Sequence, residues 1–165
     1  MTMHKKYKAG GYVKLAKLWE RAEDEAREYQ RKYYEDKFAD DEDIELVDVY
    51  IDITGSKSIA ERPEMLRLIS DCMSGRINCI ASQTRAYLAA NTEHFCYLIK
   101  YLFDLNKRID IITEDLSYNI DTIANDENQR EALYKMAVDI IGLKPEKYDR
   151  WEQSIIEGMS NLHRE

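Results

Sequence analysis

The feature that most constrains this chain is an alternation of strand-like and helix-like patterns along residues 10–125. The clearest strand is residues 44–53, where Val47, Val49 and Ile51 alternate with polar side chains at the period of two typical of a β-strand. Shorter apolar runs between helical patterns are the other expected strands: residues 11–16, 77–81 and 109–113. Strands that alternate with helices are joined by crossovers, so we predict an α/β fold with a central, mainly parallel sheet of about four strands.

Helical periodicity fills the segments between the expected strands. Apolar residues recur at three- and four-residue spacing after residue 16 and predict a helix whose buried face is Leu18, Trp19, Ala22, Ala26, Tyr29 and Tyr33. Pro63 opens a second helix, where its missing N–H is tolerated, and Gly75 closes that helix as a C-cap. Asn91 or Thr92 caps a third helix. Helices that flank a central sheet give a three-layer domain.

From about Asp126 the strand patterns stop and only helical patterns follow. One apolar stripe ends at Gly142 and consists of Leu133, Met136, Ala137, Ile140 and Ile141. A second helix starts at Pro145 and carries Trp151, Ile155, Met159 and Leu162 at spacings of four, four and three. We therefore divide the chain into a flexible N-terminus at residues 1–9, an α/β domain at residues 10–125 and an all-α C-terminal extension at residues 126–165.

Charge and composition narrow the classes of function. The net charge of -8 argues against DNA binding by this chain alone, because isolated nucleic-acid-binding modules usually have a positive net charge or a basic surface patch. Three single cysteines without CxxC spacing and three scattered histidines favour a reducing compartment and predict no metal site. No signal peptide and no run near the ~18 apolar residues that span a bilayer occur, so we expect a cytoplasmic protein without a membrane partner or small-molecule cofactor.

Several segments, taken in order over residues 10–125, resemble the N-terminal catalytic domain of the serine recombinases, the resolvases and invertases. The run Tyr12-Val13-Lys14-Leu15 resembles the family's Tyr-Val-Arg-Val strand, which precedes the nucleophilic serine. The remaining segments are a Gly-rich loop leading to the Arg62-Pro63 pair, a helix at residues 65–75, a strand and loop at residues 77–92 resembling the (Asp/Ser)-Arg-Leu-x-Arg-Asn motif, and an acidic loop at residues 114–122. The resemblance implies a resolvase-like three-layer fold and site-specific recombination through a phosphoserine link to DNA.

The same resemblance places an alanine at the position of the nucleophile. Ala16 has no oxygen with which to attack a phosphate. The arginine two residues before it is replaced by Lys14, which keeps the positive charge but loses the bidentate guanidinium fork. The arginine of the Arg-Pro pair is retained as Arg62.

The third motif departs furthest from the family pattern. With the alignment anchored on Asn91, the acidic or serine position falls on Ala86, and the two arginine positions fall on Tyr87 and Ala90. Arg85 lies one or two residues out of register. Phosphoryl transfer needs several cationic groups acting as a unit, so these changes predict a degenerate active site. A residual phosphate-binding set would be Lys14, Arg62 and Arg85.

Each of these residues also has a structural interpretation. Arg62 could pair with Glu64 or Asp52 at the surface, and Lys14 could face solvent on its strand. Tyr87 is a packing residue by this interpretation, since the chain contains twelve tyrosines. Two loop serines, Ser56 and Ser58, are the candidate substitute nucleophiles, although no histidine or basic cluster in the local sequence would activate them.

Three hypotheses of function follow from these observations. The first is a non-catalytic recombinase relative that acts as a binding or regulatory subunit in recombination or mobile-element biology, as a homodimer or as a heteromer with a related recombinase. In that family the long helix after the α/β domain dimerises, so the stripe from Leu133 to Ile141 would be the interface or would pack back on its own domain. The second is an active recombinase with a displaced site. The third is a protein-interaction module without a DNA role, because only about one helix follows Gly142, too little for a three-helix DNA reader.

Overall fold

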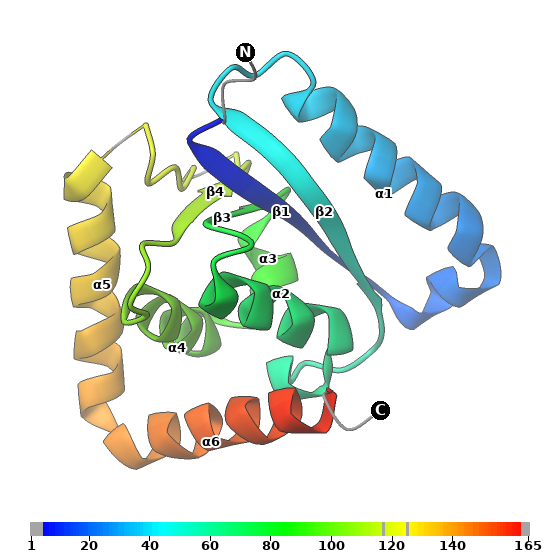
Figure 1. Cartoon of the computed structure of the whole chain (residues 1–165). Helices are drawn as coiled ribbons and strands as arrows, with labels where there is room; N and C mark the ends of the chain where they lie inside the picture. Colours follow the sequence, from blue (N-terminus) through cyan, green and yellow to red (C-terminus); the bar gives the residue numbers. More distant parts are fainter. Residues whose placement is uncertain (1–4, 117, 125, 163–165) are drawn as a thin grey trace.

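A parallel sheet of four strands runs through the middle of the molecule (Figure 1). The computed structural model describes residues 5–116, 118–124 and 126–162. The strands lie in the order β2-β1-β3-β4 and are β1 Tyr7–Leu15, β2 Ile44–Ile53, β3 Cys79–Ser82 and β4 Asp110–Thr113. All three neighbouring pairs are parallel, so the predicted α/β fold with a parallel sheet of about four strands is confirmed.

The helices follow the strands in the alternating order that the sequence predicts. They are the 3-10 helices η1 Lys17–Ala22 and η2 Ile59–Glu61, and the α-helices α1 Glu23–Phe38, α2 Pro63–Ser74, α3 Arg85–Leu88, α4 Thr92–Phe103, α5 Asp126–Leu143 and α6 Pro145–Leu162. Pro63 opens α2 and Gly75 closes it in the left-handed conformation at φ 85°. Asn91 caps α4 by accepting a hydrogen bond from the backbone N–H of His94. Helix α3 lies where the sequence predicts only a loop.

Strand β1 begins earlier than its apolar pattern indicates. It starts at Tyr7, inside the segment expected to be a flexible N-terminus at residues 1–9. Backbone and side-chain hydrogen bonds explain the extension, because Tyr7 N donates to Asp43 O and Lys8 N donates to Asn78 Oδ1. Residues 1–4 of that segment lie outside the described residues.

The two faces of the sheet contribute to two separate hydrophobic clusters. Alternate residues of β1 show this division: Val13 packs toward α1, whereas Tyr12 packs toward α2 and α4. Gly11 faces α1, and a Cβ at this position would lie 2.8 Å from the ring of Tyr34. Helix α1 thus crosses the sheet at very close range, as a strand without a side chain at that point allows.

The buried face of α1 differs from the predicted one. Three residues of the expected face are exposed, namely Leu18 at 70%, Trp19 at 48% and Tyr29 at 67%. The residues that contact the sheet are spaced by four along the helix: Ala26, Gln30, Tyr34 and Phe38. The prediction was wrong because the polar residue Gln30 belongs to the buried face. A buried polar side chain needs a hydrogen-bond partner, and the side-chain oxygen of Gln30 accepts a hydrogen bond from the side chain of Gln83.

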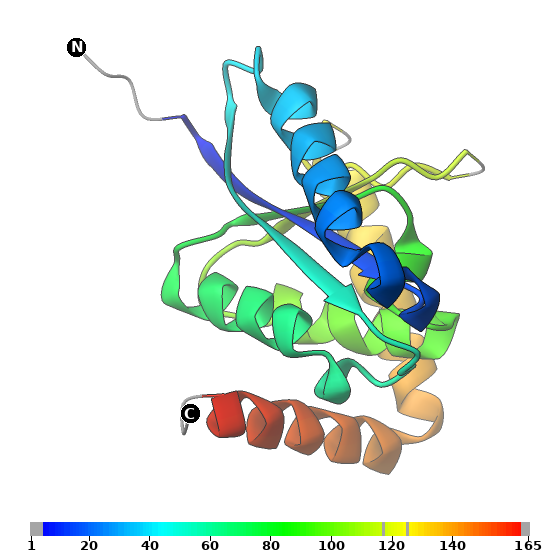
Figure 2. The same ribbon diagram turned by 90° about the vertical axis from the view of Figure 1, so that its right-hand side faces the viewer.

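The two C-terminal helices pack on the α/β domain and share its core. Figures 1 and 2 show α5 beside α4, and α6 beneath α2 on the side away from the sheet. Leu133, Ala137 and Ile141 of α5 are buried together with residues of α4, and Trp151, Ile155 and Met159 of α6 belong to the same cluster. Gly158 allows α6 to approach Leu66 closely. The extension therefore belongs to the hydrophobic cluster formed with α2 and α4.

Candidate functional site

The strand order places a topological switch point between β1 and β3. The chain moves from β1 outward to β2, then returns across β1 to β3 and β4. In such sheets the crevice at the carboxyl ends of the strands flanking the switch is where ligands bind. Here that edge carries Ala16 after β1 and the segment from Ser82 to Arg85 at the end of β3.

Ala16 lies at the carboxyl end of β1 and precedes η1. Its side chain is exposed, and its carbonyl oxygen accepts a hydrogen bond from the N–H of Trp19. The neighbouring carbonyl of Leu15 accepts from the N–H of Thr54, so the loop after β2 starts directly beside it. This loop carries the segment from Thr54 to Arg62 to the same edge of the sheet.

Arg62 is buried at 1% exposure and is held by main-chain carbonyl groups. Its Nη1 donates to Tyr87 O at 2.9 Å and to Leu88 O at 3.4 Å. Its Nε donates to Ser56 O at 3.4 Å and its Nη2 to Lys57 O at 3.5 Å. The surface pairing with Glu64 or Asp52 considered from the sequence is not the observed contact, because this side chain ties the loop after β2 to α3.

Lys14, Lys57 and Arg62 form a cationic cluster at the end of β1. Partial burial, followed by the positive charges of Arg62 and Lys57, lowers the pKa of Lys14. Three positive charges therefore lie near one another at the carboxyl end of β1. Lys57 is exposed and Lys14 is partly exposed, so both ammonium groups are accessible from solvent.

The carboxylate of Asp52, near the end of β2, is buried. Asp52 is 5% exposed and accepts hydrogen bonds from Tyr12 Oη at 2.8 Å and from the backbone N–H groups of Glu64 and Met65 at 3.0 and 2.9 Å. It therefore caps the positive N-terminus of α2. Burial, followed by the negative charge of Asp52, raises the pKa of Tyr12, so this phenol stays neutral and structural.

Of the two candidate substitute nucleophiles, Ser56 and Ser58, Ser56 has a carboxylate beside its hydroxyl group. Its Oγ donates to a carboxylate oxygen of Glu61 at 2.6 Å and accepts from the N–H of Ser58. Glu61 can accept a proton, but its negative charge would also repel a phosphate from the same hydroxyl.

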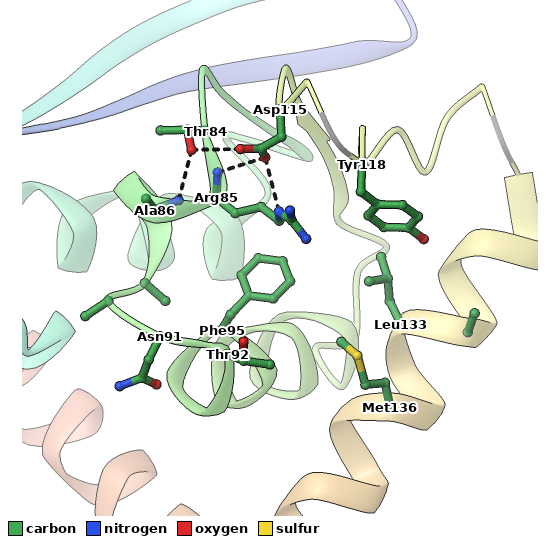
Figure 3. Close-up of a pocket in the computed structure, with 13 residues that line it drawn as sticks. Thr84, Arg85, Ala86, Asn91, Thr92, Phe95, Asp115, Tyr118, Leu133 and Met136 are labelled. Carbon is green, nitrogen blue, oxygen red and sulfur yellow. Dashed lines mark hydrogen bonds and ion pairs between the residues drawn. The ribbon is translucent and has the colours of Figure 1, made fainter.

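Arg85 lies apart from the cationic cluster, on the side of the edge that faces α5. Its Nε donates to Asp115 Oδ2 at 3.2 Å, and its guanidinium carbon lies 5.6 Å from the centre of the Tyr118 ring (Figure 3). Asp115 also accepts from Thr84 Oγ1 and from the backbone N–H of Arg85. Of the three residues predicted to bind phosphate, the structure therefore brings Lys14 and Arg62 together and pairs Arg85 with a carboxylate elsewhere.

The predicted degenerate positions of the third motif lie in and after α3. Ala86 and Ala90 are exposed, and Tyr87 is half-buried with its ring against both hydrophobic clusters. The ring of Tyr87 thus packs, while its carbonyl group anchors Arg62. None of these three side chains supplies a cation.

Three residues of the site were not singled out from the sequence. Asp115 follows β4 by two residues, Thr84 caps α3 by accepting from Ala86 N, and Lys57 follows Ser56 in the loop after β2. The acidic loop after β4 was the available signal for Asp115. Among the described residues, no group of three or more His, Cys, Asp or Glu side chains is arranged to hold a metal ion, and none of the helices is long and apolar enough to cross a membrane.

Three solved structures share the architecture of this chain. The N-terminal catalytic domain of TP901-1 integrase superposes with a TM-score of 0.59 at 22% identity, over 84% of this chain and 97% of that domain. A resolvase family site-specific recombinase from Streptococcus pneumoniae gives 0.52 at 18% identity, over 97% and 100% of the two chains. The C-terminal catalytic domain of ISC1926 TnpA, an IS607-like serine recombinase, gives 0.50 at 18%, over 96% and 99%.

Sequence comparison alone does not find these likenesses. No protein-family model matches the chain, and no curated protein is significantly similar to it in sequence. The fold nevertheless agrees with the order of segments from which the resemblance was inferred. The chain therefore has the fold of the serine recombinase catalytic domains.

Proposed function

We propose that the chain is a catalytically degenerate relative of the serine recombinases. It would act as a binding or regulatory subunit in DNA recombination and would not cut DNA itself. One observation carries the proposal: the residue at the carboxyl end of β1, which the resemblance assigns to the nucleophile, is Ala16. The fate of the two arginines supports it. Arg62 already donates to main-chain carbonyls, and Arg85 pairs with Asp115 on the side that faces α5, so we expect neither guanidinium to stabilise a phosphoryl transition state at Ala16.

The cationic cluster at the end of β1 supports a remaining, weak contact with DNA phosphates. Lys14 and Lys57 present two accessible ammonium groups, and Arg62 adds positive potential behind them. Two lysines on a protein of net charge -8 give modest affinity, since binding to DNA grows with the number of phosphates neutralised.

Two measurements test this function. Wild-type protein incubated with supercoiled DNA and quenched with denaturant is expected to give no protein–DNA adduct on a denaturing gel. The wild-type protein is expected to bind duplex DNA weakly. The double variant Lys14→Gln, Lys57→Gln should reduce the magnitude of the slope of the logarithm of the DNA-binding constant against the logarithm of salt concentration by about two. An adduct that disappears when one serine is replaced would contradict the proposal.

An active enzyme with a displaced site is the second candidate, and the Ser56–Glu61 hydrogen bond favours it. The hydroxyl lies in the same loop as Lys57 and Arg62, next to a carboxylate that could take its proton. Strand cleavage of supercoiled DNA that Ser56→Ala abolishes would establish this candidate. Cleavage absent from both proteins supports the degenerate site.

A protein-interaction module without a DNA role is the third candidate. The net charge of -8 favours it, and so do the exposed side chains of Leu18 and Trp19 immediately after Ala16. The absence of any salt-dependent retention on duplex DNA would favour this candidate over the first.

The proposed partner is a second copy of the chain or a related recombinase, with α5 as the contact. Three of the five stripe residues are buried against their own domain, whereas Met136 is 38% exposed and Ile140 is partly exposed. Val138 and Leu143 of the same helix are also exposed, at 40% and 79%. Analytical ultracentrifugation of the wild type and of Met136→Asp tests the contact: the wild type should dimerise and the variant should not.

A further inference from the structure

An open cavity of about 610 Å³ lies between α3, the N-terminus of α4, the loop after β4 and α5 (Figure 3). It is separate from the cationic cluster at the end of β1, since Lys14, Lys57 and Arg62 are not among its lining residues. It shares Met136 with the proposed α5 contact and no residue with the cationic cluster. Its volume falls in the range of ordinary small-molecule sites, which measure about 300–1,000 Å³.

Arg85 is the one cationic residue among the described residues that line the cavity, and Asp115 holds it in place. Asp115 Oδ2 accepts hydrogen bonds from Arg85 Nε at 3.2 Å and from the backbone N–H of Arg85 at 3.1 Å. Asp115 Oδ1 accepts a hydrogen bond from Thr84 Oγ1 at 2.8 Å. The Nη1 and Nη2 atoms have no hydrogen-bond partner among the described residues, and the guanidinium extends into the cavity (Figure 3). Within the part of the chain that the structure describes, Asp115 therefore holds the Nε of Arg85 and the Nη edge of the guanidinium faces the cavity.

This arrangement favours an anion at the open edge. A guanidinium presents parallel N–H groups that match a carboxylate, sulfonate or phosphate in a bidentate manner. Because Asp115 already fixes the plane of Arg85, a ligand would lose less side-chain entropy on binding than it would at a free surface arginine. Asp115 also lines the cavity, but its two oxygens already accept hydrogen bonds from three donors, and the positive charge of Arg85 offsets its negative charge.

Most of the remaining wall is apolar or aromatic, and Thr84, Asn91 and Thr92 add polar side chains to it. Phe95 and Leu133 form buried surfaces at 6% and 4% exposure, and Met136 and Tyr118 contribute more exposed ones. Ala86, Ala90 and Ala132 keep the space between them open because their side chains are short. Figure 3 shows Phe95 and Leu133 on opposite sides of the space into which Arg85 points.

We propose that this cavity binds a small amphipathic anion, with a flat apolar body between Phe95, Leu133 and Met136 and an acidic group on the open edge of Arg85. The ligand would contact α3, α4 and α5 at once. Occupancy would therefore stabilise the docking of α5 on the α/β domain, because a ligand that binds only the folded arrangement shifts the equilibrium toward it.

Two fluorescent probes that share an apolar body test the proposal on the full chain. 8-Anilinonaphthalene-1-sulfonate carries an acidic group, and N-phenyl-1-naphthylamine is the same body without it. Titration of the wild type should give saturable 1:1 binding of the sulfonate. Arg85→Gln should weaken the sulfonate about tenfold, as expected for loss of a charge-assisted hydrogen-bond pair, and leave the neutral probe unchanged.

Control variants separate the cavity from general surface binding. Ala90→Phe, which fills the space, should remove binding of both probes, and Arg27→Gln should alter neither. Arg27 is a suitable match because it also pairs with a carboxylate and is similarly exposed, at 33% against 37% for Arg85. Binding of the neutral probe by Arg85→Gln shows that this variant keeps its cavity. The proposal is overturned if Arg85→Gln binds the sulfonate as tightly as the wild type, or if Ala90→Phe retains both probes.

Discussion

Arg62 and Arg85 stand at the same edge of the sheet but in opposite surroundings. Arg62 is buried, with its guanidinium donating to main-chain carbonyls of the loop after β2 and of α3. Arg85 is partly exposed, pairs with Asp115 through one edge and leaves the other open to a cavity. Both were predicted to belong to a residual phosphate-binding set, although Arg85 lies out of register with the family motif, yet one stabilises the fold and the other lines a cavity. The role of each arginine therefore depends on the groups that its guanidinium N–H atoms contact, and not on the residue type alone.

Replacement of Arg62 should have the largest effect. Arg62→Ala leaves buried carbonyl groups without donors and creates a cavity, so we expect the free energy of unfolding to fall by about 3–5 kcal/mol. Equilibrium urea denaturation measures this change. Arg85→Ala is the matched control and should lower the same quantity by less than about 1 kcal/mol, as is usual for a partly exposed ion pair. Equal losses in the two variants would remove the distinction between the two arginines.

Truncation of the α5 wall of the cavity should have the next largest effect. Leu133 is 4% exposed and Met136 is 38% exposed on the same helix. Leu133→Ala should destabilise the protein by about 2–4 kcal/mol, whereas Met136→Ala should change stability by less than about 1 kcal/mol. Thermal and urea unfolding of both variants compare the two. A large loss in Met136→Ala alone would mean that α5 packs through its other face.

The Asp115 pair should give a smaller effect that depends on pH. Burial alone would raise the pKa of Asp115, but hydrogen bonds from Thr84, from the backbone of Arg85 and from Thr113, together with the charge of Arg85, lower it. A carboxylate whose folded pKa is lowered stabilises the folded state above its unfolded pKa of about 3.9, and this stabilisation is lost as the pH falls through the folded pKa.

Asp115→Asn should therefore be less stable than the wild type by about 1 kcal/mol at pH 7, and the difference should shrink as the pH falls below about 4. Urea unfolding across pH 2.5–7 measures it, with Asp36→Asn as a surface control whose carboxylate is 69% exposed. A difference that stays constant over this range would show that the charge of Asp115 contributes nothing to holding Arg85.

Local signals made most of the fold predictable. The period-two pattern gave β2 its bounds, and Pro63 and Gly75 marked both ends of α2 because their backbone preferences act within one or two residues. The buried face of α1 was not predictable in the same way. Its contact with the sheet depends on Gly11 meeting Tyr34 and on Gln30 finding Gln83, both of which are tertiary contacts.

The candidate site shows the same division between local and distant information. Ala16, Lys14 and Arg62 could be identified from the sequence because they belong to short segments with a recognisable order. The pairing of Arg85 with Asp115 joins residues thirty positions apart across two loops. The cavity beside it further depends on the angle at which α5 returns to α4, which no spacing in the sequence encodes.

The most direct test of the central claim is the single variant Ala16→Ser. Ala16 is exposed and precedes η1, so a serine should be accepted there without loss of stability, as unfolding measurements will check. The variant restores the hydroxyl but neither guanidinium, since Arg62 and Arg85 keep their present partners. We expect no covalent protein–DNA adduct on a denaturing gel after incubation with supercoiled DNA. A phosphoserine adduct formed by this variant would contradict the account, because it would show that only the nucleophile was missing.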